Sequence, residues 1–495
     1  MLENLLQGFA LLANTWTIAA AATGLTVGII IGAIPGLTTT MGVAILVPFT
    51  FFIPPTIGIP FLLGVYKGGI FGGSITAITI ATPGTAAAAA TVLDGYALAS
   101  RGQARKALQA SLYAVVFGDL FATMVLIAAA GPLATMALKF SSPDFTMLLA
   151  FSLTMVAAVS GRSLLKGLFA AALGILIGCV GLDPMAGSAR FTFGSTELEG
   201  GISLIPMLIG LFAISEILIQ AEARLPRIAA VGVDGREESL PPREFFRMWP
   251  TLLRSSSIGA FLGALPGLGA EIACWISYGV AKRFSKKPQE YGKGSLEGVA
   301  AAESAANAVC PAALIPMLVF AIPGDTVTAV LIGAFMAHGL NPGPLLFEKH
   351  GEIIYGLFAV LIVSNLLLLL IGRVAIRWLR NVAAVPNEVL MPIVAALCFA
   401  GAYAINSSTF DVMVALVAGI VGYAMRKIDL PVPPVVIALL LAPTLEQNLR
   451  QSLAFSDGSL AIFVTRPIAL TFLTLTLVSV AAIVYRSLRP AHARV

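Results

Sequence analysis

The sequence predicts an all-α polytopic membrane protein of about 12 transmembrane helices, arranged as two repeats that each contain broken or re-entrant helical hairpins. Three observations predict this fold class: the low content of charged residues, the long uncharged apolar segments, and the Pro-Gly interruptions that recur in both halves.

The composition is that of a chain surrounded by lipid. Of the 495 residues, 58% are hydrophobic and only 11% are charged, whereas soluble domains contain roughly a quarter charged residues. A bilayer-spanning helix needs roughly 20 apolar residues, so most of the uncharged segments fit one crossing and the first must cross more than once. The segments are apolar on all faces rather than alternating, which favours helices over a β-barrel. The uncharged segments are residues 4–66, 68–93, 120–138, 304–324, 353–372, 389–410 and 467–485.

Positive charges are concentrated in loops between the apolar segments, and the formal net charge is +5. Basic loops stay on the cytoplasmic side of a membrane, so we expect these loops and the C-terminal tail to be cytoplasmic. This topology explains the basic clusters better than nucleic-acid binding does. The clusters are Arg101, Arg105 and Lys106; Arg162 and Lys166; Lys282, Arg283, Lys286, Lys287 and Lys293; and Arg373, Arg377 and Arg380.

The N-terminus argues against a cleaved signal peptide, and the cysteines argue against disulfides and a metal site. No basic residue precedes the first apolar part, so we expect the first helix to be retained and not cleaved as a signal peptide. The four cysteines lie in apolar stretches without CxxC spacing, which indicates packing residues and neither disulfides nor a transition-metal site. The chain has only three His and no HExxH or GxSxG motif, so we expect neither an enzyme nor a bound organic cofactor.

One hydrophilic stretch divides the chain. Residues 222–254 contain Pro226, Pro241 and Pro242 and charges of both signs. We expect a linker here, on the cytoplasmic side, between a first membrane repeat at residues 1–221 and a second at residues 255–495.

The two halves share the same pattern of interruptions. The first half has GAIPGL at residues 32–37 and IATPGT at residues 80–85; the second has GALPGL at residues 263–268 and FAIPGD at residues 320–325. The spacing within each pair is similar, and the basic loop KRFSKKPQEYGKG accounts for the extra residues of the second half.

Proline removes an amide donor and breaks a helix, and in a bilayer broken helices survive only against protein or a water-filled cavity. Paired interruptions in two halves therefore indicate a transporter binding site. Four proline kinks that serve packing alone are the alternative.

The residues that follow these interruptions suit a pair of opposite ions. Hydroxyls and helix N-termini at such tips attract carboxylates, and the freed carbonyl oxygens suit Na⁺. The residues that follow the four interruptions are Thr38, Thr39 and Thr40; Thr85; Gly269, Ala270 and Glu271; and Asp325 and Thr326.

A few charged residues lie within the apolar regions, where ionisable groups are costly and face a cavity or pair with one another. Lys67 could bind a substrate carboxylate, or it could form a structural ion pair with Glu271 or Glu303. For Asp94 and His338, which lie shortly after the second and fourth interruptions, we expect helix capping near the surface.

At these residues the sequence resembles the large membrane subunit of tripartite tricarboxylate transporters, the TctA family. The stretches that carry the resemblance cover both halves: GAIPGLTTTMGVAILVPFTF, GVYKGGIFGGSITAITIATPGTAAAAATVLDGYALA, GALPGLGAEIACWISYGVAKRFSKKP, GKGSLEGVAAAESAANA and IPGDTVTAVLIGAFMAHGLNPGPLLF.

The resemblance implies a multi-pass subunit of the bacterial inner membrane that works with a small membrane subunit of four helices and a periplasmic solute-binding protein. It implies cation-coupled uptake, with Na⁺ as the expected coupling ion, of small carboxylates of the tricarboxylate and dicarboxylate class. It also implies inverted repeats with elevator-like motion.

We therefore predict a site built from the interruptions. The expected substrate-binding residues are Gly36, Thr38, Thr39, Thr40, Lys67, Pro83, Gly84, Thr85, Gly267, Gly269, Ala270, Pro323, Gly324 and Asp325, and the expected cation-binding residues are Ser304, Asn307 and Thr326. Two rival functions remain: a channel, which would dissipate gradients without the binding protein, and an intramembrane enzyme, which would need a clustered nucleophile or carboxylate pair.

Overall fold

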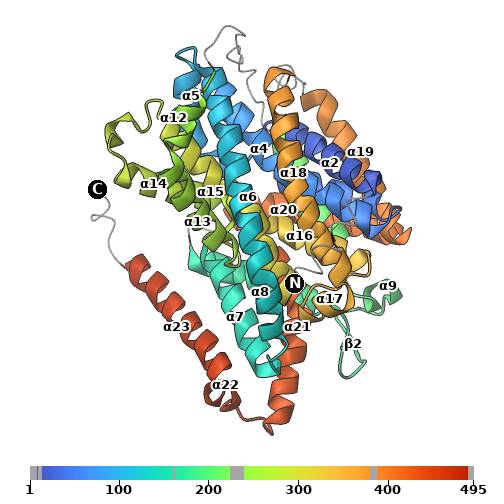
Figure 1. Ribbon diagram of the computed structural model, residues 1–495. Coiled ribbons are helices and arrows are strands. Elements are labelled where there is room, and N and C mark those ends of the chain that lie inside the picture. Colours follow the sequence, from blue (N-terminus) through green and yellow to red (C-terminus); the bar gives the residue numbers. More distant parts are fainter. Residues whose placement is uncertain (1–7, 9–13, 160–162, 223–238, 379–386, 489–495) are drawn as a thin grey trace.

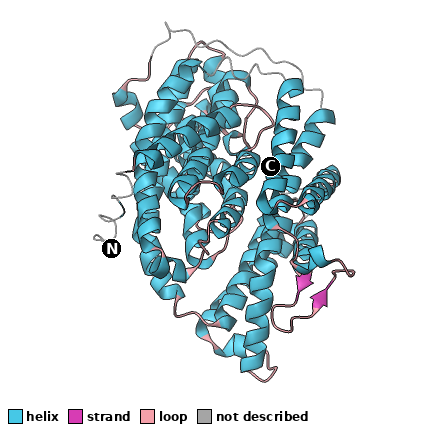
Figure 2. Cartoon of the chain, turned by 90° about the vertical axis from the view of Figure 1, so that its right-hand side faces the viewer, coloured by secondary structure: helices cyan, strands magenta, loops and turns pink. Residues whose placement is uncertain are grey.

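The computed structural model describes residue 8 and residues 14–159, 163–222, 239–378 and 387–488. Within these ranges the chain is helical apart from its loops and one small antiparallel sheet (Figures 1 and 2). Most of the predicted linker, residues 223–238, lies outside the described residues, as do Arg162 and Arg380.

The first half contains α2 (Thr15–Gly32), α3 (Thr39–Thr50), α4 (Pro55–Ile80), η2 (Ala86–Ala88), α5 (Thr91–Ala99), α6 (Ala104–Ala137), α7 (Ser142–Val159), α8 (Leu164–Gly178), β1 (Gly181–Leu182), β2 (Ala189–Arg190), α9 (Thr196–Glu199), α10 (Leu204–Leu208), the π-helical η3 (Ile209–Ile214) and α11 (Ser215–Glu222). In the sheet, Gly181 pairs with Arg190 and Leu182 with Ala189.

The second half contains α12 (Pro242–Phe246), α13 (Trp249–Gly263), α14 (Gly269–Phe284), η4 (Pro288–Glu290), α15 (Leu296–Phe320), α16 (Thr326–Ala337), α17 (Pro344–Lys349), α18 (Gly351–Trp378), α19 (Asn387–Asn406), α20 (Thr409–Lys427), α21 (Pro433–Phe455), α22 (Ile462–Thr465) and α23 (Pro467–Leu488).

The predicted fold class, an all-α polytopic membrane protein, is confirmed. Seven helices of the described part are long and apolar enough to cross a membrane, and shorter apolar helices accompany them. The most apolar windows of α4 and α15 are each 94% buried within the protein, so these two helices form its centre. The expected total of about 12 crossings stays a prediction.

The Pro-Gly sequences interrupt helices in the same way in both halves. The first and third interruptions separate α2 from α3 and α13 from α14, and each turns through a glycine of positive φ, Gly36 at +92° and Gly267 at +82°. The second and fourth end α4 and α15, and each helix ends at an alanine in the left-handed conformation, Ala81 at φ 56° and Ala321 at φ 57°. A non-glycine residue pays roughly 1–2 kcal/mol for this conformation, so its recurrence at matching positions marks a shared local geometry.

Small residues bring the paired helices together. A Cβ atom on Gly32 of α2 would lie 2.1 Å from the carbonyl oxygen of Gly69 in α4, and a Cβ atom on Gly259 of α13 would lie 2.2 Å from that of Ala305 in α15. Such close approach of backbones is typical of transmembrane helix pairs, whose association depends on van der Waals packing and interhelical hydrogen bonds.

We call the helix pairs α2–α3 and α13–α14, which flank the first and third interruptions, the two hairpins. The two hairpins end at opposite ends of the molecule. The end of α3 meets the end of α16, where Thr50 Oγ1 and His338 Nε2 lie 3.1 Å apart. The end of α14 is instead followed by the loop that Asp94 of α5 holds: its carboxylate accepts from the backbone N–H groups of Gly292, Gly294 and Ser295, each at 2.8 Å. Figure 1 shows α5, α12 and α14 toward the upper end and α9, β2, α17 and α22 at the lower end. His338 is the C-cap residue of α16, as predicted. The capping role predicted for Asp94 was wrong: Ala90 is the N-cap residue of α5, and the buried Asp94 carboxylate instead holds the loop before α15.

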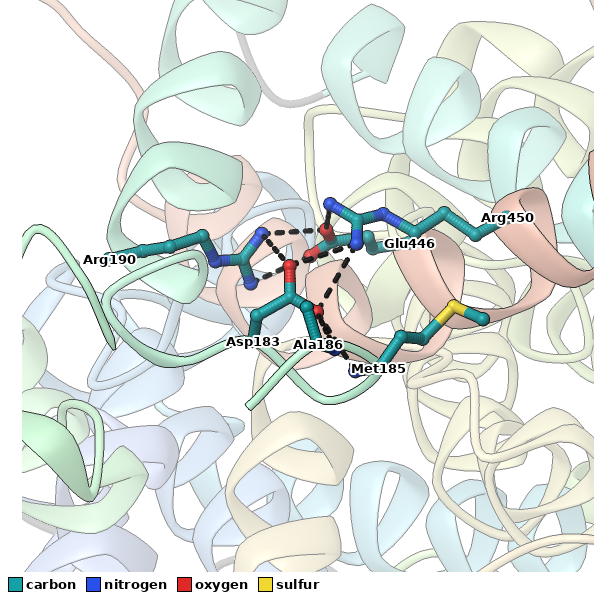
Figure 3. Close-up of polar contacts among 6 residues, drawn as sticks. All are labelled: Asp183, Met185, Ala186, Arg190, Glu446 and Arg450. Atoms are coloured by element: carbon teal, nitrogen blue, oxygen red, sulfur yellow. Dashed lines mark hydrogen bonds and ion pairs between the residues drawn. The ribbon is translucent and has the colours of Figure 1, made fainter. Parts of the chain in front are cut away.

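At the lower end, four charged side chains fasten the small sheet to α21 (Figure 3). Arg190 donates to both oxygens of Glu446, at 2.6 and 3.0 Å, and Arg450 donates to Asp183 at 2.8 Å. The backbone N–H groups of Ala186 and Met185 also donate to Asp183, and together with Arg450 they lower the pKa of this carboxyl to about 2. The carboxylate form of Asp183 thus holds the loop in place.

Candidate functional site

All four interruptions meet at one cavity. It has a volume of about 220 Å³, and α21 contributes the remaining part of its wall through Pro433 and Ile437. The lining residues from the interruptions and adjoining helices are Thr38, Thr39, Thr40, Tyr66, Ile70, Thr85, Ala86, Ala87, Gly267, Leu268, Gly269, Ala270, Glu271, Ile272, Asp325, Thr326 and Val327.

Hydroxyl groups dominate the polar part of the lining. The hydroxyls of Thr40 and Thr326 lie 2.8 Å apart, so a direct hydrogen bond joins the first interruption to the fourth. Those of Thr39 and Thr85 are buried and have no hydrogen-bond partner in the described part of the chain. Buried polar atoms without partners are rare in native proteins, and these two hydroxyls lie against α4, beside Gly69 and Gly73.

Asp325 forms the start of α16. One carboxylate oxygen accepts from the backbone N–H and the hydroxyl of Thr328, both at 2.8 Å, which completes a capping box. The other oxygen accepts a hydrogen bond from the hydroxyl of Tyr66 on α4. Asp325 therefore links the fourth interruption to the central helix of the first half.

The charges of the lining are unusual for a site that would take an anion. Glu271 is exposed toward the cavity and Asp325 lies beside it, while no Lys, Arg or His of the described residues lines the wall. Three helices of 12 to 16 residues (α3, α14 and α16) begin at this wall. Helix N-termini carry unpaired N–H groups and a partial positive charge, although Thr38 and Asp325 each accept from one such N–H group, at α3 and α16. The cavity thus offers two carboxylates for a cation and the remaining N–H groups of three helix starts for an anion.

Lys67 lies outside this lining. Its ammonium group forms an ion pair with Asp119 of α6 at 2.5 Å and donates to Ser364 at 2.5 Å and to the carbonyl of Leu361 at 3.0 Å. Of the two roles predicted for Lys67, the structural ion pair is present, but its partner is Asp119 and not Glu271 or Glu303. Lys67, also predicted to bind substrate, does not line the cavity. A buried lysine needs a counter-charge, and Asp119, which lies next to a long uncharged segment, provides it.

The turns are shaped by other predicted residues, namely Gly36, Pro83, Gly84, Gly267, Pro323 and Gly324. Of these, Gly267 alone also lines the cavity. Gly84 N–H donates to the carbonyl of Gly73 at 3.2 Å, and Gly267 N–H donates to that of Gly324 at 2.8 Å. Gly36 abuts the side chain of Gln220, where a Cβ atom would collide with the amide nitrogen. Pro83 and Pro323 precede these glycines within the second and fourth interruptions.

Two of the three predicted cation ligands also lie away from the lining. Asn307 donates to the carbonyl of Glu303 at 3.2 Å within α15. The Ser304 backbone packs against Gly118 of α6, and the Ser304 hydroxyl has only a weak contact with the carbonyl of Ala301, at 3.5 Å. Thr326 lines the cavity.

The two hairpins differ in their surroundings even though their sequences match. Ala44 and Ile45 of α3 are 0% and 6% exposed, whereas the corresponding Trp275 and Ile276 of α14 are 48% and 43% exposed. The helix α3 packs against α19 and η3. In the described part of the chain α14 packs mainly against α13, α15 and η2 instead. The structure is thus asymmetric at the positions where the repeats correspond.

The fold and the cavity define a class: a polytopic α-helical membrane protein whose broken helices converge on one internal site. A family model described as "Tripartite tricarboxylate transporter TctA family" matches residues 18–437. The chain belongs to the TctA family, and it is therefore a membrane component of a tripartite tricarboxylate transporter.

Two relatives come from Agrobacterium vitis. One, described as an uncharacterized 52.8 kDa protein in the TAR-I ttuC' 3' region, is 35% identical over 100% of this chain and 98% of its own length. The other, described as an uncharacterized protein in the TAR-II ttuC' 3' region, is 37% identical over 47% of this chain and 96% of its own length. No solved structure matches the chain.

Proposed function

We propose that this chain is the large membrane subunit of a secondary active transporter that takes up small di- or tricarboxylates together with a cation, Na⁺. The observation that carries the proposal is the convergence of all four interruptions on one cavity lined by threonines, helix N-termini and two carboxylates.

The substrate carboxylate binds at the hydroxyls of Thr39 and Thr85 and at the starts of α3, α14 and α16. Glu271 and Asp325 would repel an anion that entered alone, because at short range the interaction of like charges costs several kcal/mol in a medium of low polarity. A cation bound beside these carboxylates removes the repulsion. The acidic lining thus gives a physical reason for cation and substrate to bind together.

The substrate arrives from a periplasmic binding protein, and a small membrane subunit of four helices completes the complex in the bacterial inner membrane. The basic loops support this orientation. Arg101, Arg105 and Lys106 follow α5, and Lys282 and Arg283 end α14, so both groups lie toward the upper end in Figure 1. Positive loops remain in the cytoplasm, so in the proposed orientation the sheet and α22 face the periplasm.

Transport proceeds by an elevator-like exchange of the two hairpins. The exposed face of α14 and the buried face of α3 occupy matching positions in the two repeats. In a second conformation the face of α14 is buried and that of α3 is exposed. Because the two repeats match, this conformation has a similar energy, and it opens the cavity to the other side of the membrane.

The test is uptake of labelled citrate and succinate into vesicles that contain the complete complex, with and without a Na⁺ gradient. Thr39→Ala and Thr326→Ala should reduce uptake while the protein still inserts and folds. Thr26→Ala is the matched control, because this threonine is exposed on α2 and bonds only to its own helix. Normal uptake kinetics in both site variants would remove these residues from the site, and uptake that needs no gradient would contradict a coupled carrier.

A further inference from the structure

A second polar cluster lies in the centre of the protein, around Glu303 of α15. Its side chain is 1% exposed. One carboxylate oxygen accepts from the hydroxyl of Thr91 on α5, and the other accepts from the hydroxyl of Ser74 on α4 at 2.7 Å. None of these residues lines the cavity.

No basic side chain of the described residues neutralises the carboxylate of Glu303. In the described part of the chain no Lys, Arg or His pairs with it, and Lys67, the nearest basic residue in the sequence of α4, is occupied by Asp119. The titratable group that faces it from α14 is the thiol of Cys274. An unpaired carboxylate inside a membrane protein is costly, so the cluster needs a positive partner that the chain does not supply.

A third hydroxyl identifies where such a partner would bind. Ser111 of α6 is 0% exposed and lies beside the same carboxylate, but its hydroxyl has no well-formed hydrogen bond to any described group. Buried hydroxyls without partners call for an explanation, and an absent ion is one. Four helices thus direct two carboxylate oxygens and three hydroxyl oxygens to one place.

We propose that Glu303, Ser74, Thr91 and Ser111 form a binding site for one Na⁺ ion. Hard cations prefer oxygen ligands, and a single carboxylate balances a single positive charge, whereas a divalent ion would call for more carboxylates. Serine and threonine in helices can donate to the carbonyl one turn earlier, as Ser74 can to Ile70, which leaves the hydroxyl oxygen free to ligate the ion. The inference rests on the cation coupling of the proposed function and adds a Na⁺ site that is separate from the cation proposed beside Glu271 and Asp325 in the cavity.

The site is connected to the cavity through the second interruption. Thr91 begins α5 directly after η2, whose Ala86 and Ala87 line the cavity. Ser74 lies on the same helix as the cavity-lining Tyr66 and Ile70. An ion that holds α4, α5, α6 and α15 together therefore fixes the wall that receives the substrate.

The test is thermal unfolding of the purified full chain in detergent, with NaCl replaced stepwise by choline chloride at constant ionic strength. We expect saturable stabilisation by Na⁺ in the unmodified chain, its loss in Glu303→Gln, and a half-saturating Na⁺ concentration about tenfold higher in Ser111→Ala, as expected when one ligand of about 1.4 kcal/mol is removed. The matched control is Ser256→Ala, because Ser256 of α13 is also buried without a partner but lies outside the cluster, and it should leave the Na⁺ response unchanged.

Three results would overturn the proposal. The first is an unchanged Na⁺ response in both Glu303→Gln and Ser111→Ala. The second is that acid, and not Na⁺, stabilises the unmodified chain, and that Glu303→Gln removes this effect. That result would assign a proton to this carboxyl. The third is a Na⁺ response that Thr40→Ala and Thr326→Ala abolish but Glu303→Gln does not, which would place the ion in the cavity and leave the proposed carrier intact. Because unfolding needs no transport, a failure of the carrier proposal would appear separately, as Na⁺ binding without any effect of citrate or succinate.

Discussion

The buried pair of Lys67 and Asp119 is a single contact on which the packing of three helices depends. The two side chains are 1% and 2% exposed, and Ser364 of α18 shares the ammonium group. Removing one partner leaves an uncompensated buried charge, which costs about 3–5 kcal/mol, whereas replacing both with apolar residues of similar size is close to neutral.

We therefore expect Lys67→Met to unfold at a clearly lower temperature than the unmodified chain, and Lys67→Met with Asp119→Leu to regain most of the loss. Thermal unfolding in detergent measures both. A double variant as unstable as the single variant would contradict a role limited to charge compensation and would favour a direct role of Lys67 in transport.

The Asp183 carboxylate is a second single group, and its contribution to the stability of the fold depends on pH. Its pKa in the folded protein, about 2, is below its ordinary value because Ala186, Met185 and Arg450 stabilise the charged form. A group with a lowered pKa stabilises the fold above its unfolded pKa of about 4 and loses this contribution as the pH falls toward 2.

Asp183→Asn should accordingly lower the unfolding temperature at pH 6, and the difference from the unmodified chain should shrink between about pH 4 and pH 2. Asp457→Asn is a suitable control, because this aspartate of the same end is not held by any described ion pair. A difference that does not change with pH would exclude the charged form of Asp183 as the cause.

At the scale of the elements, the asymmetry between α3 and α14 has a direct consequence. In an elevator-like exchange, the position of Trp275 becomes covered when that of Ala44 becomes exposed. We expect a cysteine introduced at residue 275 to react rapidly with a water-soluble maleimide and to be protected when the other conformation is populated. A cysteine at residue 44 should show the opposite change.

The measurement is the labelling rate of Trp275→Cys and Ala44→Cys in membranes, with and without Na⁺ and citrate, in a chain whose four native cysteines are replaced. Leu165→Cys, at an exposed position of α8, serves as the control whose labelling should not respond. Labelling rates that rise or fall together at residues 44 and 275 would be inconsistent with an exchange of the two hairpins.

The sequence predicted these elements well because each interruption has a local cause. Each adjacent Pro-Gly pair in GAIPGL and FAIPGD coincides with a turn, whereas single prolines such as Pro60 and Pro311 lie inside helices. The threonines after the first, second and fourth pairs line the cavity. Tyr66 and Asp119 could not be placed in this way, since their partners Asp325 and Lys67 are distant in sequence and meet only through packing. Nor could Pro433 and Ile437, which lie on a regular helix that closes the cavity from outside.

At the scale of the whole molecule, the proposed carrier depends on two halves of the chain that bring their interruptions to one cavity. Two hydrogen bonds join the halves directly at the cavity, that from Tyr66 to Asp325 and that between the hydroxyls of Thr40 and Thr326, which lie 2.8 Å apart. A rigid bond at the second of these contacts would close the cavity to a substrate and prevent relative movement of the hairpin and α16.

The most direct measurement is therefore disulfide formation in Thr40→Cys with Thr326→Cys, made in the background without the native cysteines Cys179, Cys274, Cys310 and Cys398. We predict that mild oxidation joins the two cysteines, stops uptake of labelled citrate or succinate by the complete complex, and that reduction restores it, while each single variant is unaffected by the oxidant. Failure of the two cysteines to join, or full uptake by the cross-linked protein, would contradict a shared cavity at the four interruptions as the site of transport.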